Sequence, residues 1–180
     1  MLIQKASWIT MDGAASTVVP VFRRLFSCPK PVRSATLEVT CDGVYDAYLN
    51  GSRVGDFILA PGWTEYRKRL QVQAYDVAET LREENTLEIT VANGWYRRTN
   101  APWTGTRNPD EFLPAMLIAA LRLAFEDGSE EVICTDGAWE VSESTVTLSG
   151  IFIGEDADMT RTPAFRPAKV CEFSKQMLIP

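Results

Sequence analysis

The stretch Tyr48-Leu49-Asn50-Gly51-Ser52-Arg53-Val54-Gly55 decides the fold class, because it predicts a tight β-hairpin. An Asn-Gly pair between strand-like segments is the strongest short hairpin signal, since both central residues of a type I′ turn need a positive φ. The preceding run, Val44–Leu49, leads directly into this turn. We therefore expect antiparallel β-structure at the centre of the chain.

Alternating sequence flanks the hairpin on both sides. The segment from Ala35 to Cys41 alternates apolar and polar residues, and the segment from Leu87 to Val91 repeats the pattern. Side chains of a β-strand point to opposite faces in turn, so this period predicts half-buried strands. The alternation thus extends the β-prediction well beyond the hairpin.

Two segments carry helical signals. Residues 113–125 are rich in Ala, Met and Leu, which favour helix, but they also alternate and lead through Asp127-Gly128 into a second strand-like run, 130–135. We interpret this region as a β-hairpin. The segment Asp76–Arg82 is predicted to form a helical turn, with Asp76 as its N-cap and Glu79 completing a capping box.

These patterns together predict an all-β protein. Many short strands separated by turn residues are typical of an antiparallel β-sandwich, here with one or two short helical turns. The length of 180 residues is enough for one domain with a sizeable core. We expect a single domain over residues 1–180.

Charge and hydropathy exclude several classes of partner. Eighteen Lys and Arg residues against 24 Asp and Glu residues give a net charge of −6, which lacks the basic surface that nucleic acids require. The longest apolar run, Phe112–Leu121, is too short to cross a bilayer. The N-terminal stretch lacks the pattern of a secretory signal. We therefore expect no nucleic acid, no membrane and a cytoplasmic location.

The sequence contains no histidine, which limits the catalytic mechanisms that the chain could use. A Ser-His-Asp triad, a Cys-His pair and an imidazole base are all excluded, whereas glycoside hydrolysis by paired carboxylates is not. The four cysteines form no CxxC pair, so we interpret them as reduced and expect no zinc site. No nucleophile elbow or phosphate-binding loop is present. We predict no catalytic residue, no metal and no cofactor.

Three loops place tryptophan beside glycine and polar residues: Pro61–Arg67, Asn93–Arg98 and Ala101–Gly105. Aromatic faces can stack on sugar rings, and Asn and Arg can bond sugar hydroxyls; the alternative is that these aromatics fill a core or an interdomain contact. The carboxylates of Gly154–Asp158 with Arg161 could bind a hard cation such as calcium through oxygen ligands, but their spacing matches no EF-hand loop. We therefore assign them to a solvated turn or an ionic interdomain contact, with calcium as the alternative. The candidate substrate-binding or interdomain residues are Trp63, Tyr66, Arg67, Asn93, Trp95, Tyr96, Arg97, Trp103, Glu155 and Arg161.

The order of these motifs resembles a known family. The hairpin followed by Tyr75-Asp76-Val77 resembles the galactose-binding-like jelly-roll domains attached to many glycoside hydrolases. More specifically, Leu59–Arg69 followed by Gly94–Arg97 is similar to the N-terminal domain of bacterial α-L-rhamnosidases. The likeness also includes motifs at both ends, Ala6-x-Trp8-Ile9 with Pro20–Phe26, and Gly150–Glu155 through Arg161. It covers nearly the whole chain.

The resemblance implies a noncatalytic accessory domain. In the family, the acid and base carboxylates lie in a downstream (α/α)₆ barrel, and this chain ends at Pro180, so no catalytic position carries over and we expect the chain alone to be inactive. The implied partners are that catalytic domain and rhamnose-containing glycans or glycosides. The late family motif Gly-Glu-x-Tyr-Asp-Ala-Arg is altered here, with Ala157 in the tyrosine place and two residues between Asp158 and Arg161.

Alternative functions stay open at this point. One is an enzyme complete in 180 residues, and another is a carbohydrate-binding module of a β-galactosidase-like or fucosidase-like hydrolase. Within the leading hypothesis, the aromatic loops either hold sugar or are buried against the barrel.

Overall fold

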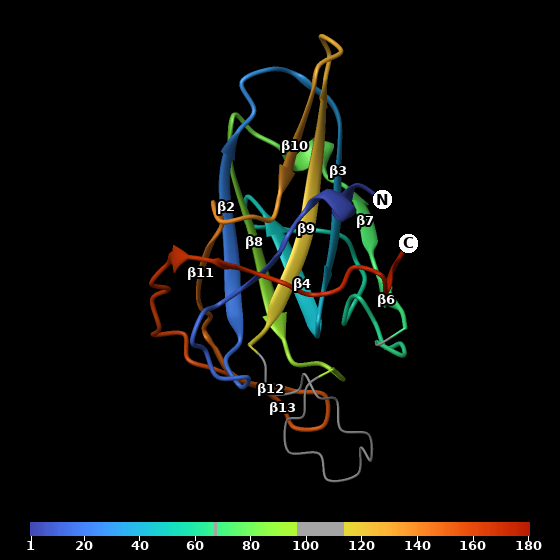
Figure 1. The fold of residues 1–180 in the computed structure, drawn as a ribbon. Helices are drawn as coiled ribbons and strands as arrows, with labels where there is room; N and C mark the ends of the chain where they lie inside the picture. The colour runs from blue at the N-terminus through green and yellow to red at the C-terminus, as the bar shows by residue number, and fades with distance from the viewer. Residues whose placement is uncertain (67, 97–113) are drawn as a thin grey trace.

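The computed structural model describes residues 1–66, 68–96 and 114–180, which fold as an antiparallel β-sandwich (Figure 1). One sheet has the strand order β15-β1-β9-β3-β7, and β10 pairs with β9 along the same edge as β1. Its strands are β1 (Trp8–Thr10), β3 (Val32–Cys41), β7 (Gln73–Asp76), β9 (Met116–Phe125), β10 (Glu130–Cys134) and β15 (Lys169–Cys171). The prediction of an all-β sandwich is confirmed.

The facing sheet has the strand order β14-β11-β2-β8-β4-β5. Its strands are β2 (Pro20–Ser27), β4 (Val44–Leu49), β5 (Ser52–Arg53), β8 (Glu84–Ala92), β11 (Glu140–Glu143) and β14 (Arg166–Pro167). Two small pairs complete the description: the hairpin of β12 (Val146–Gly150) with β13 (Gly154–Ala157), and the parallel pair of β6 (Leu70–Gln71) with β16 (Leu178–Ile179).

The predicted hairpin forms between β4 and β5, and its turn is closed by side chains. Asn50 and Gly51 both have positive φ, 54° and 79°, as a type I′ turn requires. The Asn50 amide nitrogen donates to the Thr80 carbonyl at 2.8 Å and to Oδ1 of Asn85 at 2.9 Å, while its oxygen accepts from the Thr86 backbone N–H. Asn85 in turn bonds both backbone groups of Arg82. This network joins the hairpin to the start of β8.

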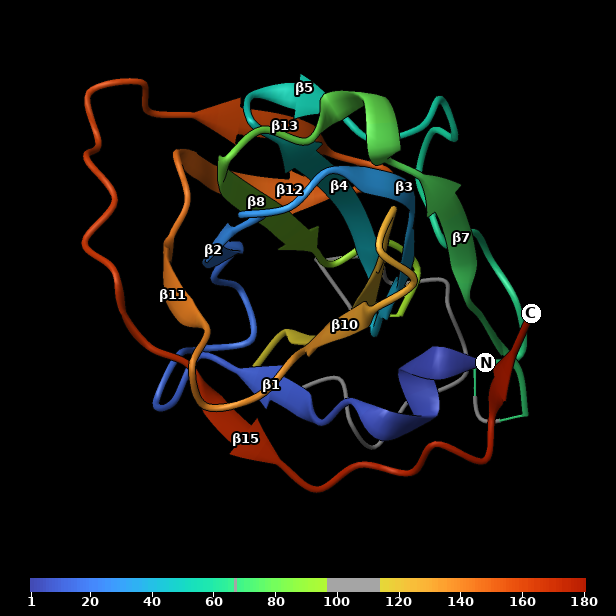
Figure 2. The same cartoon turned by 90° about the horizontal axis from the view of Figure 1, so that it is seen from above.

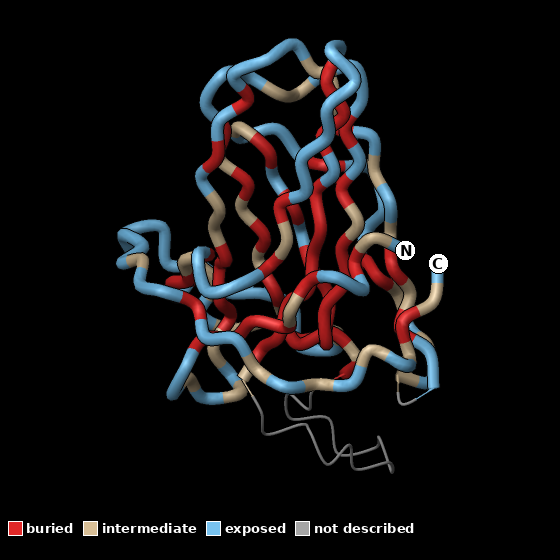
Figure 3. The backbone as a smooth tube through the Cα atoms, turned by 45° about the horizontal axis from the view of Figure 1, so that its top comes forward, coloured by how far each residue is buried: buried red, intermediate tan, exposed pale blue. Residues whose placement is uncertain are grey.

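Strand β9 explains why the sandwich has two apolar clusters. Its residues Leu117, Ala119 and Leu121 face the interior between the sheets, as the alternation predicts. Its other face is apolar as well: Met116 and Ile118 pack in a second cluster outside the sheet. The N-terminal 3₁₀ turn and the C-terminal segment run along this outer side (Figure 2). Figure 3 shows the buried residues concentrated along the paired strands.

The helical expectation is confirmed only in part. Two 3₁₀ turns form, η1 (Leu2–Lys5) and η2 (Ala78–Thr80). The capping box is wrong, because Asp76 lies in β7, where it pairs with Thr36, and its carboxylate accepts from the Ala78 N–H instead. No helix among the described residues is long and apolar enough to span a membrane.

Candidate functional site

Two of the three aromatic loops meet at the end of the sandwich where β4 begins and β8 ends. The chain reaches this end at Ala60, whose carbonyl accepts from the Tyr45 N–H at 2.7 Å. The rings of Tyr66 and Tyr96 then touch edge to face, with centroids 5.1 Å apart. Such pairs add to the stability that burial alone provides. Two of the predicted loops are therefore joined, and we call the region formed by residues 57–66 and 93–96 the aromatic end.

Glycines allow the 93–96 turn to lie against the start of β4. Gly94 has a φ of 54°, and a Cβ there would lie 2.7 Å from Cγ1 of Val44. A Cβ on Gly43 would collide with the Ala92 carbonyl oxygen. Only glycine accepts both the left-handed backbone and this close approach. The turn that presents Trp95 and Tyr96 is fixed by backbone packing.

Asn93 is a buried polar residue of this end. It is 1% exposed, and its side-chain oxygen has no hydrogen-bond partner among the described residues. Buried polar side chains are usually hydrogen-bonded, so this acceptor is available to a donor. Asn93 belongs to the predicted site residues, but its burial was not part of that prediction.

The aromatics of this end differ in exposure. Trp63 is 74% exposed, Trp95 is half-buried and Tyr96 is buried. Tyr66 is half-buried and donates from its hydroxyl to the Gly62 carbonyl at 3.2 Å. Burial, with a smaller effect of the nearby Cys41 and Tyr96, raises the pKa of Tyr66 above its ordinary value. Among the described residues of this end, Trp63 is thus the aromatic side chain most open to a ligand or a partner.

The aromatic end begins with an exposed apolar segment. Phe57, Ile58 and Leu59 follow one another in a loop, and Ile58 is 68% exposed. Leu59 has a φ of 59°, in a region that bulky side chains rarely adopt. The Gly62 N–H donates to the Leu59 carbonyl and closes the turn. The backbone is therefore held in an unfavourable conformation that keeps apolar side chains in solvent.

Glu155 and Arg161 lie in the segment that begins with the β12–β13 hairpin, and Arg161 forms its hydrogen bonds with Glu143 and Asp158 rather than with the described residues of the aromatic end. Glu155 is exposed on β13, in a hairpin drawn at the same end of the sandwich in Figure 1. Arg161 is exposed and forms an ion pair with Glu143 at 3.2 Å. The described residues hold no group of three or more Asp, Glu, Cys or His side chains arranged for a metal. Both interpretations of this segment, a solvated turn and an ionic contact with another domain, stay predictions.

Three predicted site residues, Arg67, Arg97 and Trp103, lie outside the described residues. The neighbouring Lys68 and Arg69 are exposed, and both backbone N–H groups donate to the Glu65 carbonyl in a turn.

A buried carboxylate at this end was not predicted. Asp42 follows β3 directly, is fully buried, and accepts from the Met116 N–H at 2.7 Å. The Asp42 N–H donates to the Met116 carbonyl in return. The Asp-Gly pair at 42–43 predicts a turn between two strands. It does not predict that the carboxylate points inward and accepts from the first backbone N–H of β9.

Comparison with known proteins identifies the relatives of this chain. A protein-family model described as the α-L-rhamnosidase N-terminal domain matches residues 30–175. An α-L-rhamnosidase from Streptomyces avermitilis is 39% identical over 146 residues, which cover 79% of this chain and 14% of that protein. An α-L-rhamnosidase from an Alteromonas species is 32% identical over 168 residues, which cover 87% of this chain and 18% of that protein. The chain spans less than a fifth of the length of these two relatives.

Solved structures agree with this assignment. A native α-L-rhamnosidase from Aspergillus terreus superposes with a TM-score of 0.85 at 28% identity, over 98% of this chain and 22% of that one. The S. avermitilis α-L-rhamnosidase complexed with L-rhamnose gives 0.74 at 30% identity, over 87% of this chain and 16% of that one. A Pleurotus ostreatus lectin, at 22% identity and a TM-score of 0.65, covers 100% of this chain and 47% of its own and shares the fold alone. Sequence and structure thus lead to one conclusion: this chain belongs to the α-L-rhamnosidase N-terminal domain family.

Proposed function

We propose that this chain is a noncatalytic accessory domain of an α-L-rhamnosidase-like glycoside hydrolase, where it packs on the catalytic domain and takes part in recognising L-rhamnosides. The observation that carries this proposal is the aromatic end. It combines an exposed tryptophan, Trp63, with an unsatisfied buried acceptor, Asn93. Both features are unfavourable in an isolated domain and become favourable when something covers them.

Packing on another domain is supported by the loop 57–59. Consecutive exposed apolar side chains are typical of interaction surfaces, and Ile58 is 68% exposed. The left-handed conformation of Leu59 costs about 1–2 kcal/mol. Such strain persists where a functional contact requires it. Because this chain spans 14–22% of its relatives, a catalytic domain is the natural partner for this loop.

Sugar recognition is supported by the chemistry of the same end. Trp63 and Trp95 offer aromatic surface, and the Asn93 oxygen can accept from a sugar hydroxyl. The S. avermitilis relative was solved with L-rhamnose, which makes L-rhamnose the first ligand to test. We place the chemistry of hydrolysis in the catalytic domain, because the family resemblance puts the acid and base carboxylates there and gives no catalytic position in this chain. The cytoplasmic location and the lack of a nucleic-acid partner stay predictions.

Two measurements test the proposal. Purified chain is expected to leave a chromogenic α-L-rhamnoside intact, whereas turnover would show a complete enzyme. Hydrogen exchange is then compared between this chain alone and a longer polypeptide that includes the adjoining gene segment. Residues 57–63 should exchange more slowly in the longer polypeptide, with the Asn50 turn as the internal control. Equal exchange at 57–63 in both would contradict packing through this loop.

A further inference from the structure

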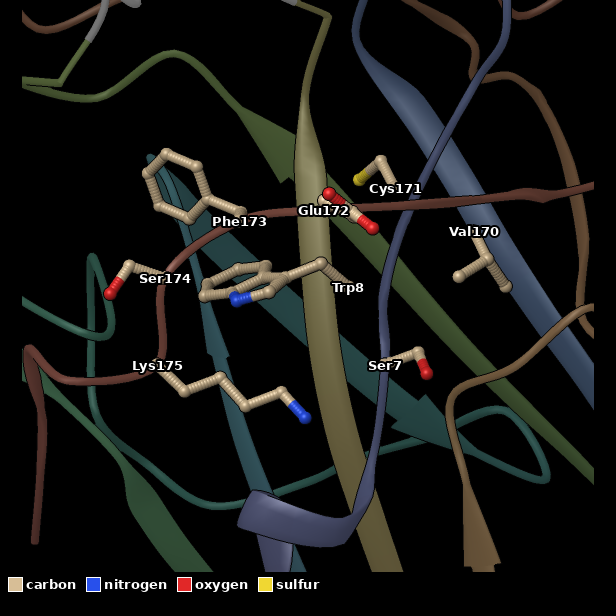
Figure 4. Close-up of a pocket in the computed structure, with 8 residues that line it drawn as sticks. All are labelled: Ser7, Trp8, Val170, Cys171, Glu172, Phe173, Ser174 and Lys175. Atoms are coloured by element: carbon tan, nitrogen blue, oxygen red, sulfur yellow. The ribbon is translucent and has the colours of Figure 1, made fainter.

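A groove lies on the outer side of the sandwich, at the edge formed by β1 and β15. It has a volume of about 520 Å³, within the range of small-molecule sites. Two chain segments line it, the start of β1 and the stretch from β15 onward, which are paired through Trp8 and Cys171 (Figure 4). The lining residues are Ser7, Trp8, Val170, Cys171, Glu172, Phe173, Ser174 and Lys175.

The floor of the groove is rigid and aromatic. Trp8 is 1% exposed and belongs to the second apolar cluster, together with Ile3 and Ile118. Phe173 packs against it edge to face, with centroids 5.3 Å apart at 88°. A close-packed aromatic pair keeps its geometry. The aromatic floor is therefore a fixed part of the fold.

One polar group in this floor has no partner. The indole N–H of Trp8 is buried and has no hydrogen-bond acceptor among the described residues. An indole nitrogen can only donate, so the group that would complete it is a hydrogen-bond acceptor. Figure 4 shows this nitrogen on the edge of the ring toward Lys175. The Lys175 ammonium donates to the Gln4 carbonyl at 3.1 Å, and its flexible side chain can move to admit a ligand atom.

The rim carries one negative and one positive side chain, neither of which is in an ion pair with another described residue. Glu172 is exposed and Lys175 is half-buried. Ser7 and Ser174 add hydroxyls that can donate or accept. Donors and acceptors thus surround an aromatic floor, and the two charges sum to zero.

We propose that this groove binds a neutral monosaccharide unit and is a second carbohydrate subsite, separate from the aromatic end. One sugar hydroxyl oxygen accepts from the Trp8 indole N–H and from Lys175, and a neighbouring hydroxyl donates to Glu172. A neutral polyol suits a rim of zero net charge better than an anion or a cation, because either ion would face one like charge. This assignment does not depend on sugar binding at Trp63 and Trp95.

The indole resonances test the proposal directly. Nitrogen–proton NMR spectra of the full chain are recorded with L-rhamnose and, separately, D-glucose in the millimolar range where weak complexes form. The Trp8 indole resonance, assigned with Trp8→Phe, is expected to shift. Glu172→Gln should weaken that binding about tenfold, as expected for the loss of a charge-assisted hydrogen bond. Glu131→Gln, at an exposed position of β10, is the matched control and should leave the affinity unchanged.

The possible results either support or overturn a sugar subsite at Trp8. A Trp8 shift with either sugar that Glu172→Gln weakens supports the subsite. No Trp8 shift with both sugars overturns it, and so does a shift that Glu172→Gln and Glu131→Gln affect equally. Shifts of Trp63 and Trp95 without Trp8 overturn the subsite while supporting the aromatic end, so the two proposals fail separately.

Discussion

Asparagine side chains are hydrogen-bonded at one end of strands β4 and β8 and incompletely hydrogen-bonded at the other. At the hairpin end, Asn50 and Asn85 bond each other and the surrounding backbone. At the aromatic end, Asn93 is as buried as Asn85, yet its oxygen has no partner among the described residues, and Trp63 of the same end is 74% exposed. The hairpin end completes its own hydrogen bonds, whereas the aromatic end leaves contacts for something else to make.

The comparison separates stability from recognition within one sandwich. A closed polar network rigidifies the fold around it. An open one lowers stability and is retained where a ligand or another domain completes it. We therefore expect substitutions at the hairpin end to change the free energy of unfolding, and substitutions at the aromatic end to change binding.

The largest effect on stability is expected for Asn85→Ala. This side chain is 3% exposed, and its removal leaves the Arg82 N–H and the Asn50 amide without their acceptor. The free energy of unfolding should fall by about 2–4 kcal/mol, measured by urea denaturation. Asn93→Ala is the matched control and should cost at least about 1 kcal/mol less, because the oxygen that it removes is already unpaired. Equal losses would break the comparison.

A smaller loss is expected at the turn itself. Asn50→Gly keeps the positive φ but removes the side-chain bonds to Thr80, Asn85 and Thr86. It should cost about 1–2 kcal/mol in the same denaturation experiment. Asn50→Ala should cost about 1 kcal/mol more, since alanine also resists the left-handed backbone. If glycine and alanine were equal, the turn would not depend on φ.

Alkaline pH should weaken the aromatic end. Burial raises the pKa of Tyr66, so the folded state holds the phenol proton more tightly than the unfolded state does. Stability is then complete below the ordinary tyrosine pKa near 10 and falls as the pH rises above it. Tyr66→Phe removes this contribution. Unfolding measured at increasing alkaline pH should therefore show a shallower decline in the variant, and an identical decline would contradict the assignment.

The smallest effect on stability is expected for Trp63→Ala. This side chain is 74% exposed, so its loss should change the free energy of unfolding by less than about 0.5 kcal/mol. Its effect should instead appear in binding of L-rhamnose or of the catalytic domain. Differential scanning calorimetry measures the stability of the variant, and titration calorimetry measures its binding, so the two effects can be separated on the same protein. A large loss of stability would mean that Trp63 supports the fold.

The sequence predicted the features that depend on local pattern. The Asn50-Gly51 turn and the strands around it follow from φ requirements and period-2 alternation, and the family resemblance is confirmed by the comparisons. The 113–125 region was ambiguous because its apolar residues fit helix and strand alike. Residues Met116–Phe125 of this region form strand β9, because they pair with β3 along one edge and with β10 along the other. Both faces of the strand are buried, Leu117 between the sheets and Ile118 outside.

Features that depend on distant contacts could not be predicted. The burial of Asn93 and Asp42 arises where the ends of several strands meet, and no local pattern encodes that meeting. The groove at Trp8 forms because Phe173 returns to the first strand from the far end of the chain. The capping box failed because pairing with Thr36 holds Asp76 in a strand.

The most direct test of the difference between the two ends is a titration of the full chain with L-rhamnose, followed by NMR of backbone and indole N–H groups. The indole resonances of Trp63 and Trp95 should shift and saturate, and Asn93→Ala should reduce the affinity, while the resonances of Asn50 and Asn85 stay in place. Absence of any shift at Trp63 and Trp95, or shifts confined to the hairpin end, would contradict the assignment of recognition to the aromatic end.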